Sequence, residues 1–180
     1  MPGNGRVMDD RLVDQQEHLP RWFAIRTAPR HEKRVNERLL SHGIESFLPL
    51  WQKLNRWKDR RKLIEVPLFS SYCFAHFALR DRLRVIKTVG VLNIVGYGRG
   101  PEPLEDEEIE SLKTLVSSSL RYDPCPDLKE GMRVEVVHGP LKSVRGTLIR
   151  KDAKYRLLIA VNLIRQGAIV EIDASDIVPI

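Results

Sequence analysis

Apolar and polar residues alternate in short runs along the last fifty or so residues of the chain. The runs cover Met132–Val137, Val144–Ile149, Leu157–Leu163 and Ala168–Ile172, and glycines or a Gly-Pro pair separate them. An open sheet of such short strands would leave two long unpaired edges, and closing the sheet on itself removes those edges. The pattern therefore predicts a small five-stranded β-barrel over residues 128–180.

The earlier part of the chain switches between strand-like and helix-like periodicity. A strand is predicted at Trp22–Arg26, followed by a helix that Pro29 opens and Gly43 ends. A long hairpin comes next, with Leu54–Lys62 as its charged tip, and another strand follows at Ser71–Phe77. The residues expected along one face of the helix are Val35, Leu39 and His42.

A second helix is expected to start at Asp81, which can cap it, and to end at Gly90. A strand over Val91–Val95 and a helix with an acidic first turn over Leu104–Leu115 complete the order. The inward residues of the second helix would be Leu83, Ile86 and Val89. This order predicts an α/β sandwich over residues 20–116, with helices packed on an antiparallel sheet, and hence an α+β chain.

Composition places two irregular segments around this first domain. Residues 1–19 are polar and acidic, with too few large apolar residues to offset the entropy of ordering them, so a disordered tail is expected. Residues 117–127 contain three serines and two prolines, which predicts a flexible linker. No stretch approaches the roughly 20 apolar residues of a membrane helix or resembles a signal peptide, so no membrane partner and a cytoplasmic location are expected.

Charge is distributed unevenly along the chain, whose formal net charge is +6. Residues 21–62 hold 12 Lys or Arg against 4 Asp or Glu, whereas residues 101–130 hold 3 against 9. The basic half of the first domain therefore favours a polyanionic partner. Cys73 and Cys125 show no metal-ligand spacing, and no nucleophile with a spaced base stands out. We expect no metal, no cofactor and no catalytic activity.

Two segments resemble known motifs of one family. The sequence G-M-R-V-E-V-V-H-G-P-L-K-S-V-R-G over residues 131–146 is similar to the KOW motif. Upstream, R-W-F-A-I-R-T-A-P-R-H-E-K-R (21–34), F-L-P-L (47–50), P-L-F-S-S-Y-C-F (67–74) and T-V-G-V (88–91) resemble the first domain of NusG-family transcription elongation factors. Their order is more similar to specialised paralogues such as RfaH than to the general factor.

The resemblance implies a monomeric transcription elongation factor that binds RNA polymerase and suppresses pausing and termination. In the family, the positions that match Phe69 and Tyr72 line an apolar concavity that grips the clamp of the largest polymerase subunit. We assign Trp22 and Phe74 to the same polymerase-binding set. The alternative for each aromatic is a place in the core. This chain has Ser70-Ser71 where the family usually has Pro-Gly.

Two basic groups are candidates for contacts with DNA or nascent RNA. In the family this face lies near the upstream fork and the displaced DNA strand, and Trp57 could stack on an unpaired base while cations hold phosphates. The alternative for both groups is a solvated face. The candidates are Arg26, Arg30, His31, Lys33 and Arg34 around the first helix, and Arg56, Trp57, Lys58, Arg60, Arg61 and Lys62 at the hairpin tip.

In the barrel, Leu141, Ile164 and Arg165 are candidates for a partner surface, with core packing as the alternative for the two apolar residues. The matching surface of the general factor engages a small-subunit ribosomal protein or the Rho helicase. Ser143 replaces a usual glycine of the motif, and Arg165-Gln166 replaces Gly-Arg. Barrel cations that could bind RNA instead are Lys142, Arg145, Arg150, Lys151 and Lys154.

Two other functions are compatible with these residues. A ribosome-associated or RNA-binding KOW protein would use the barrel, with the first domain as an adaptor. A nuclease would need His31 to act with Asp59, a pairing that rests on residue types alone. Some relatives hold the KOW domain as a helical hairpin, but the β-branched residues of this segment favour a barrel.

Overall fold

The computed structural model of the chain describes residues 18–57, 60–98, 100–126, 131–151 and 154–180. The tail expected at residues 1–19 lies almost wholly outside this part of the chain. None of the helices within these ranges is long and apolar enough to cross a membrane.

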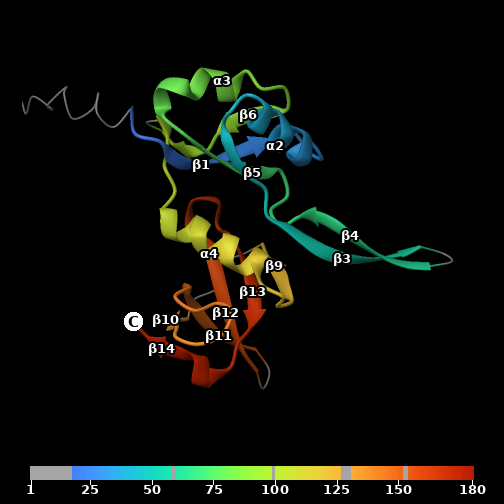
Figure 1. Cartoon of the computed structure of the whole chain (residues 1–180), viewed down its shortest axis with the longest axis vertical. Coiled ribbons are helices and arrows are strands. Elements are labelled where there is room, and N and C mark those ends of the chain that lie inside the picture. Colours follow the sequence, from blue (N-terminus) through green and yellow to red (C-terminus); the bar gives the residue numbers. More distant parts are fainter. Residues whose placement is uncertain (1–17, 58–59, 99, 127–130, 152–153) are drawn as a thin grey trace, which may run out of the picture.

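The first domain is built on a four-stranded antiparallel sheet (Figure 1). Its strands, in spatial order, are β2 (Glu45–Phe47), β5 (Tyr72–Phe77), β1 (Arg21–Thr27) and β6 (Val91–Ile94). Helices α2 (Glu32–Ser41) and α3 (Arg82–Ile86) cover one face. Between them and the sheet lies an apolar core, whose buried members include Phe23, Ile25, Val35, Leu39, Ala75, Phe77, Val85 and Ile94. This part of the expected sandwich is confirmed.

Helix α2 begins later than expected. The chain first makes a turn, in which the His31 N–H donates to the carbonyl of Ala28 and Arg30 has a φ of 63°. Glu32, Val35 and Leu39 are the buried residues of the helix. The expectation that His42 shares this inward face was wrong, because the helix ends at Ser41 and His42 is exposed.

The second helical segment also differs from the prediction. It consists of a 3-10 turn, η1 (Leu79–Asp81), and only five residues of α3, of which Val85 alone is buried. Asp81 makes no side-chain cap and lies near Arg84 instead. The three residues expected to point inward, Leu83, Ile86 and Val89, are 58%, 44% and 70% exposed. So short a helix can direct only one residue into the core.

The remaining elements of this part flank the sheet. The predicted hairpin is present as β3 (Leu50–Trp57) and β4 (Arg60–Pro67), which extend away from the body of the molecule (Figure 1). A small ribbon pairs β7 (Gly96–Tyr97) with β8 (Gly100–Pro101). Helix α4 (Asp106–Ser117) follows, with Asp106, Glu107 and Glu108 in its first turn. These acids suit the partial positive charge of a helix amino terminus.

The carboxyl-terminal part is the small antiparallel β domain that the sequence predicts. It contains six strands where five were expected, and two short 3-10 turns, η2 (Asn162–Ile164) and η3 (Ala174–Asp176), interrupt them. The strands in spatial order are β14 (Ile177–Pro179), β10 (Met132–Val136), β11 (Arg145–Lys151), β12 (Lys154–Val161), β13 (Gln166–Glu171) and β9 (Tyr122–Cys125). We call this six-stranded unit the barrel below.

Strand β9 comes from the segment that was expected to be an irregular linker. Its residues pair with β13 from Tyr122↔Val170 to Cys125↔Gly167. The expectation was wrong for these four residues, because β9 lies at the end of the strand order, where a proline such as Pro124 is tolerated. Only residues 118–121 remain between α4 and the barrel.

Three departures from the family pattern lie in left-handed backbone. Ser71, Ser143 and Arg165 have φ values of 64°, 69° and 55°, in the region where a Cβ atom is disfavoured. The resemblance described above places each of them where the family usually has glycine. These three residues therefore have a backbone conformation that glycine adopts more easily than they do.

Replacing Ser143 by glycine is expected to raise the free energy of unfolding by about 0.5–1 kcal/mol, because glycine adopts positive φ without steric cost. Chemical denaturation would measure the change. Ser119→Gly is the matched control, because Ser119 is exposed and has no positive φ. Equal effects of the two substitutions would contradict the prediction.

Candidate functional site

Candidate polymerase-binding residues gather on the face of the sheet opposite α2 and α3. The antiparallel register of β1 and β5 places Trp22 opposite His76, Ala24 opposite Phe74 and Arg26 opposite Tyr72. Directly opposed residues share a face of the sheet. Phe69, from the turn before β5, packs edge-on against Phe74, with 5.8 Å between ring centroids. The structure thus brings together the four aromatics that were assigned to the polymerase-binding set.

Most of this aromatic face is buried in the arrangement described here. Trp22, Phe69 and Phe74 are 5%, 1% and 0% exposed, and Tyr72 is half-buried. They belong to one continuous apolar cluster that also includes α4 residues and core residues of the barrel. The same cluster thus joins the aromatic face, α4 and the core of the barrel.

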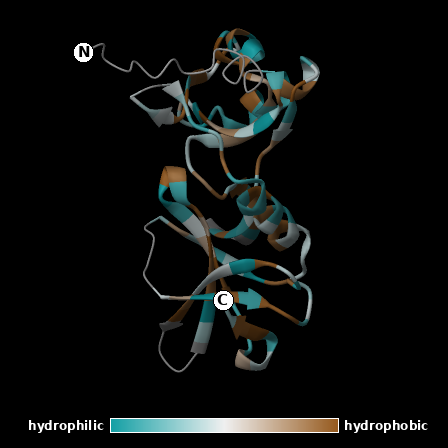
Figure 2. Cartoon of the chain, turned by 90° about the vertical axis from the view of Figure 1, so that its left-hand side faces the viewer, coloured by the Kyte–Doolittle hydropathy of each residue, from teal (hydrophilic) through white to brown (hydrophobic). Residues whose placement is uncertain are grey.

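Helix α4 lies between the sheet and the barrel and contacts both (Figure 1 and Figure 2). On the sheet side, the Lys113 ammonium lies 4.6 Å from the centre of the Trp22 ring and 3.8 Å from a carboxylate oxygen of Glu45. On the barrel side, Glu107 lies 3.6 Å from the Arg145 guanidinium. We call this the closed arrangement: α4 contacts both the sheet of the first domain and the barrel.

Glu108 makes the most specific polar contact of this interface. One of its carboxylate oxygens accepts hydrogen bonds from the backbone N–H of Asn162, at 3.1 Å, and from the Asn162 side-chain amide, at 2.5 Å. Burial raises the pKa of Glu108, while the two hydrogen bonds from Asn162 oppose the rise. The charged carboxylate is therefore partly desolvated when the domains are closed.

Variants of Glu108 should separate the effect of the acceptor from that of the charge. Glu108→Ala removes both hydrogen bonds and is expected to destabilise the closed structure by about 1 kcal/mol. Glu108→Gln keeps an oxygen acceptor without the charge and should be at least as stable as the native protein at pH 7. Thermal unfolding of both variants measures this, and a Gln variant as unstable as the Ala variant would contradict it.

The direction of the pKa shift also sets a pH dependence. A carboxyl group with a raised pKa binds its proton more readily in the folded state, so its contribution to stability rises as pH falls toward the ordinary value of 4.5 and is least favourable above the raised pKa. Glutamine does not titrate, so the free energy of unfolding of Glu108→Gln should lack this rise between neutral pH and pH 4.5.

The basic residues around α2 form an exposed surface beside the aromatic face. Arg26, Arg30 and Arg34 are exposed and make no ion pair among the described residues. Lys33 is also exposed, but its ammonium donates to the carbonyl of Glu65 at 2.9 Å and so joins α2 to β4. His31 is half-buried, and its Nδ1 lies 3.0 Å from the carbonyl of Pro29.

The structure describes the second basic group only in part. The hairpin register places Arg56 opposite Arg61 and Trp57 opposite Arg60. Lys58 and Asp59 lie outside the described residues, as do the side chains of Arg56, Trp57, Arg60 and Arg61, whereas Lys62 is exposed. The hairpin candidates and the nuclease pairing with Asp59 therefore stay predictions.

The barrel offers less of the expected partner surface. Leu141 and Ile164 are buried in the apolar cluster, whereas Arg165 is exposed. Their burial favours core packing, which was the alternative interpretation for Leu141 and Ile164. Arg145 is occupied by Glu135, at 2.8 Å, and by Glu107, so it is not an unpaired cation available for RNA.

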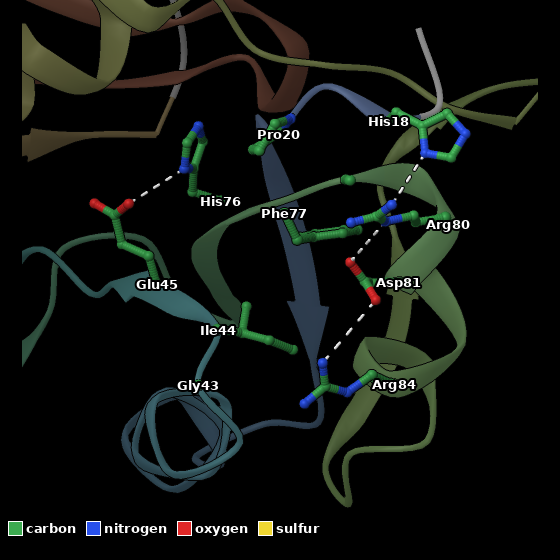
Figure 3. Close-up of a pocket in the computed structure, with 11 residues that line it drawn as sticks. His18, Pro20, Gly43, Ile44, Glu45, His76, Phe77, Arg80, Asp81 and Arg84 are labelled. Atoms are coloured by element: carbon green, nitrogen blue, oxygen red, sulfur yellow. Dashed lines mark hydrogen bonds and ion pairs between the residues drawn. The ribbon is translucent and has the colours of Figure 1, made fainter. Parts of the chain in front are cut away.

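A cavity of about 260 Å³ lies on the first domain, between β5, the start of β2 and α3 (Figure 3). Its charged groups are paired: the Arg80 and Arg84 guanidinium groups lie 3.8 and 4.0 Å from Asp81. The His76 ring lies 3.2 Å from Glu45. Since these charges are already paired, we assign the cavity no ligand. Among the described residues, no group of His, Cys, Asp or Glu is arranged to hold a metal ion.

Sequence reasoning missed the residues that hold the site together. Glu32 was counted only as a charge, Glu108 only as part of the acidic start of a helix, and Asn162 was not singled out. A signal for Glu108 was present, since an acidic first turn close to a domain boundary can serve a neighbouring domain as well as its own helix. The sequence contains no such signal for Glu32, because its hydrogen-bond partner Ser71 is 39 residues away in sequence.

Comparison with known proteins places this architecture. The model of the family described as "Transcription termination factor nusG" matches residues 20–113, more than half of the chain. A transcription termination/antitermination protein NusG of Borreliella burgdorferi is 26% identical over 87% of this chain and 96% of its own length. A protein of the same name from Campylobacter jejuni is 27% identical, with the same two coverages.

A solved structure, titled "Domain interaction in Thermotoga maritima NusG", has a similar fold, with a TM-score of 0.55 and 18% identity. The alignment covers 89% of this chain and 97% of that one. A sheet domain followed by a small barrel, together with the family match, defines a transcription elongation and antitermination factor. The chain belongs to the NusG family.

Proposed function

We propose that this factor binds the clamp of the largest RNA polymerase subunit through the aromatic face of its first domain. The observation that carries the proposal is the gathering of Trp22, Phe69, Tyr72 and Phe74 on one face of the sheet. Aromatic side chains bury much area at small entropic cost, which is why they recur as anchors at interfaces. Tyr72 is the accessible member of the set in the closed arrangement.

Binding at this face requires the closed arrangement to open. A protein whose competent state is only partly populated shows a weaker apparent affinity, in proportion to that population. The barrel and α4 therefore compete with the polymerase for the same apolar surface. Contacts such as Glu108 with Asn162 set how strongly they compete.

The exposed cations of α2, with the hairpin, are proposed to hold DNA or nascent RNA while the aromatic face holds the clamp. Arg26 supports this division of roles, because it is exposed and lies opposite Tyr72 at the border of the two surfaces. Contacts with phosphates release counterions, so this part of the binding should weaken steeply with added salt.

The effect on transcription follows from differential binding. A factor that binds the elongating polymerase more tightly than the paused one shifts the equilibrium by the difference in affinity. A difference of about 1.4 kcal/mol changes the occupancy of the pause tenfold. We propose antitermination by this route, in a cytoplasmic monomer with no catalytic activity and no cofactor. Rho or a small-subunit ribosomal protein is a further proposed partner, at the surface around Arg165.

Tyr72→Ala provides the test of the polymerase contact. Loss of an interface anchor should weaken binding of purified RNA polymerase about thirtyfold, and pausing should return to its level without the factor. Tyr155→Ala is the control, because Tyr155 is a 40% exposed tyrosine of the barrel. Unchanged polymerase binding by Tyr72→Ala would refute the assignment. Co-sedimentation with ribosomes that is lost when residues 128–180 are deleted would support the RNA-binding alternative.

A further inference from the structure

The turn that carries Phe69 and Tyr72 is held by a buried carboxylate from α2. Glu32 is 5% exposed, and one of its oxygens accepts a hydrogen bond of 2.7 Å from the backbone N–H of Ser71. No basic side chain lies within ion-pair distance of Glu32 among the described residues. A buried charge without a cation depends on hydrogen bonds, so this contact carries much of what keeps the carboxylate in place.

The turn requires such support because its backbone is unfavourable for the residue present. Ser71 has a φ of 64°, which glycine adopts freely and serine does not. The other backbone contacts of the turn run from the Tyr72 N–H to the Phe69 carbonyl, at 3.3 Å, and from the Thr27 N–H to the Ser71 carbonyl, at 2.8 Å. Neither of them satisfies the Ser71 N–H.

The charge of Glu32 also reaches the first residues of β5. Burial raises the pKa of the Cys73 thiol to about 12, and the negative charge of Glu32 contributes to the rise. Cys73 is completely buried on the other face of the sheet from Tyr72. The carboxylate thus lies close to the strand that begins with Tyr72.

We propose that Glu32 is a positioning residue for polymerase binding: its carboxylate fixes Ser71 in the left-handed conformation, which in turn sets the places of Phe69 and Tyr72. This inference rests on the proposed function of the aromatic face. It assigns Glu32 no contact with the polymerase itself. A turn that is already ordered before binding loses less entropy when the partner arrives.

Three full-length variants test the role of Glu32. Glu32→Ala leaves the Ser71 N–H without its acceptor and should weaken polymerase binding roughly tenfold. Glu32→Gln keeps an oxygen acceptor and should bind within about twofold of the native protein. Adding Ser71→Gly to Glu32→Ala lowers the cost of the left-handed conformation and should restore most of the lost affinity.

These outcomes separate positioning from a merely structural role. If Glu32 served only the stability of the core, Ser71→Gly would not restore binding to the Ala variant. The inference is overturned if the double variant binds as weakly as Glu32→Ala, or if Glu32→Gln is as impaired as Glu32→Ala. Circular dichroism at the assay temperature confirms that each variant is folded.

Hydrogen exchange at the Ser71 amide tests the contact without polymerase. Exchange should be at least tenfold faster in Glu32→Ala than in the native protein, because that amide loses its acceptor. An unchanged exchange rate would overturn the positioning role, whatever the binding data show. If Tyr72→Ala leaves polymerase binding intact, the proposed function fails, whereas an effect of Tyr72→Ala without one of Glu32→Ala refutes only the inference about Glu32.

Discussion

Replacing Phe69 by alanine is expected to lower the free energy of unfolding by about 3–5 kcal/mol. The Phe69 ring is 1% exposed and packs against Phe74, so its removal leaves a cavity in a continuous core. For a chain of this size, the loss corresponds to a melting temperature lower by roughly 6–20 °C. Calorimetry or thermal unfolding followed by circular dichroism would measure the change.

The result matters for the design of binding experiments. A variant at Phe69 changes folding and polymerase binding together, whereas the half-buried Tyr72 reports mainly on binding. Tyr72→Ala, measured in parallel, should lose less than half as much stability. A Phe69→Ala protein as stable as the native one would show that the ring is not buried in solution, and that the closed arrangement is not the main one.

Replacing Ser111 by arginine is expected to separate the barrel from α4. Ser111 is 6% exposed and lies four residues after Glu107 and three after Glu108, the two acids that contact the barrel. Residues at this spacing share one side of a helix. A long charged side chain there adds overpacking, at about 1–3 kcal/mol, to the cost of burying a charge. Each 1.4 kcal/mol lowers the closed population tenfold relative to the open one.

Ser117→Arg is the matched control, because Ser117 belongs to the same helix and is exposed. Electron–electron distances between spin labels at the exposed positions Ser41 and Ser175 should lengthen and broaden in Ser111→Arg and stay unchanged in Ser117→Arg. If the proposed function is right, Ser111→Arg should also bind polymerase more tightly than the native factor. An unaltered distance distribution would contradict the role given to α4.

Local patterns predicted much of the fold. The strand at Trp22–Arg26, the charged hairpin and the alternating runs of the barrel all exist, because each depends on neighbours that are close in sequence. The prediction failed where an element is too short for its period to decide its orientation. Val85 packs inward from α3, whereas Leu83 and Ile86, which gave the stronger pattern, are exposed.

The candidate site was only partly predictable, for a different physical reason. The aromatics could be found because strand alternation and a family resemblance both mark them. Their burial in one cluster with α4 and the barrel could not be predicted, because contacts such as Glu108 with Asn162 join residues 54 positions apart. Strand β9 could not be predicted for the same reason. It forms by pairing with the distant strand β13, whereas its Ser- and Pro-rich sequence favours an irregular chain.

The pairing of β9 with β13 limits how far the barrel can travel once it leaves α4. While β9 stays attached, residues 118–121 alone join the two parts, and four extended residues reach about 14 Å. Release of β9 lengthens the free chain to residues 118–131, which reach about 48 Å. The edge pairing thus sets two limits on how far the barrel can move from α4, a short one while β9 is paired with β13 and a longer one after β9 is released.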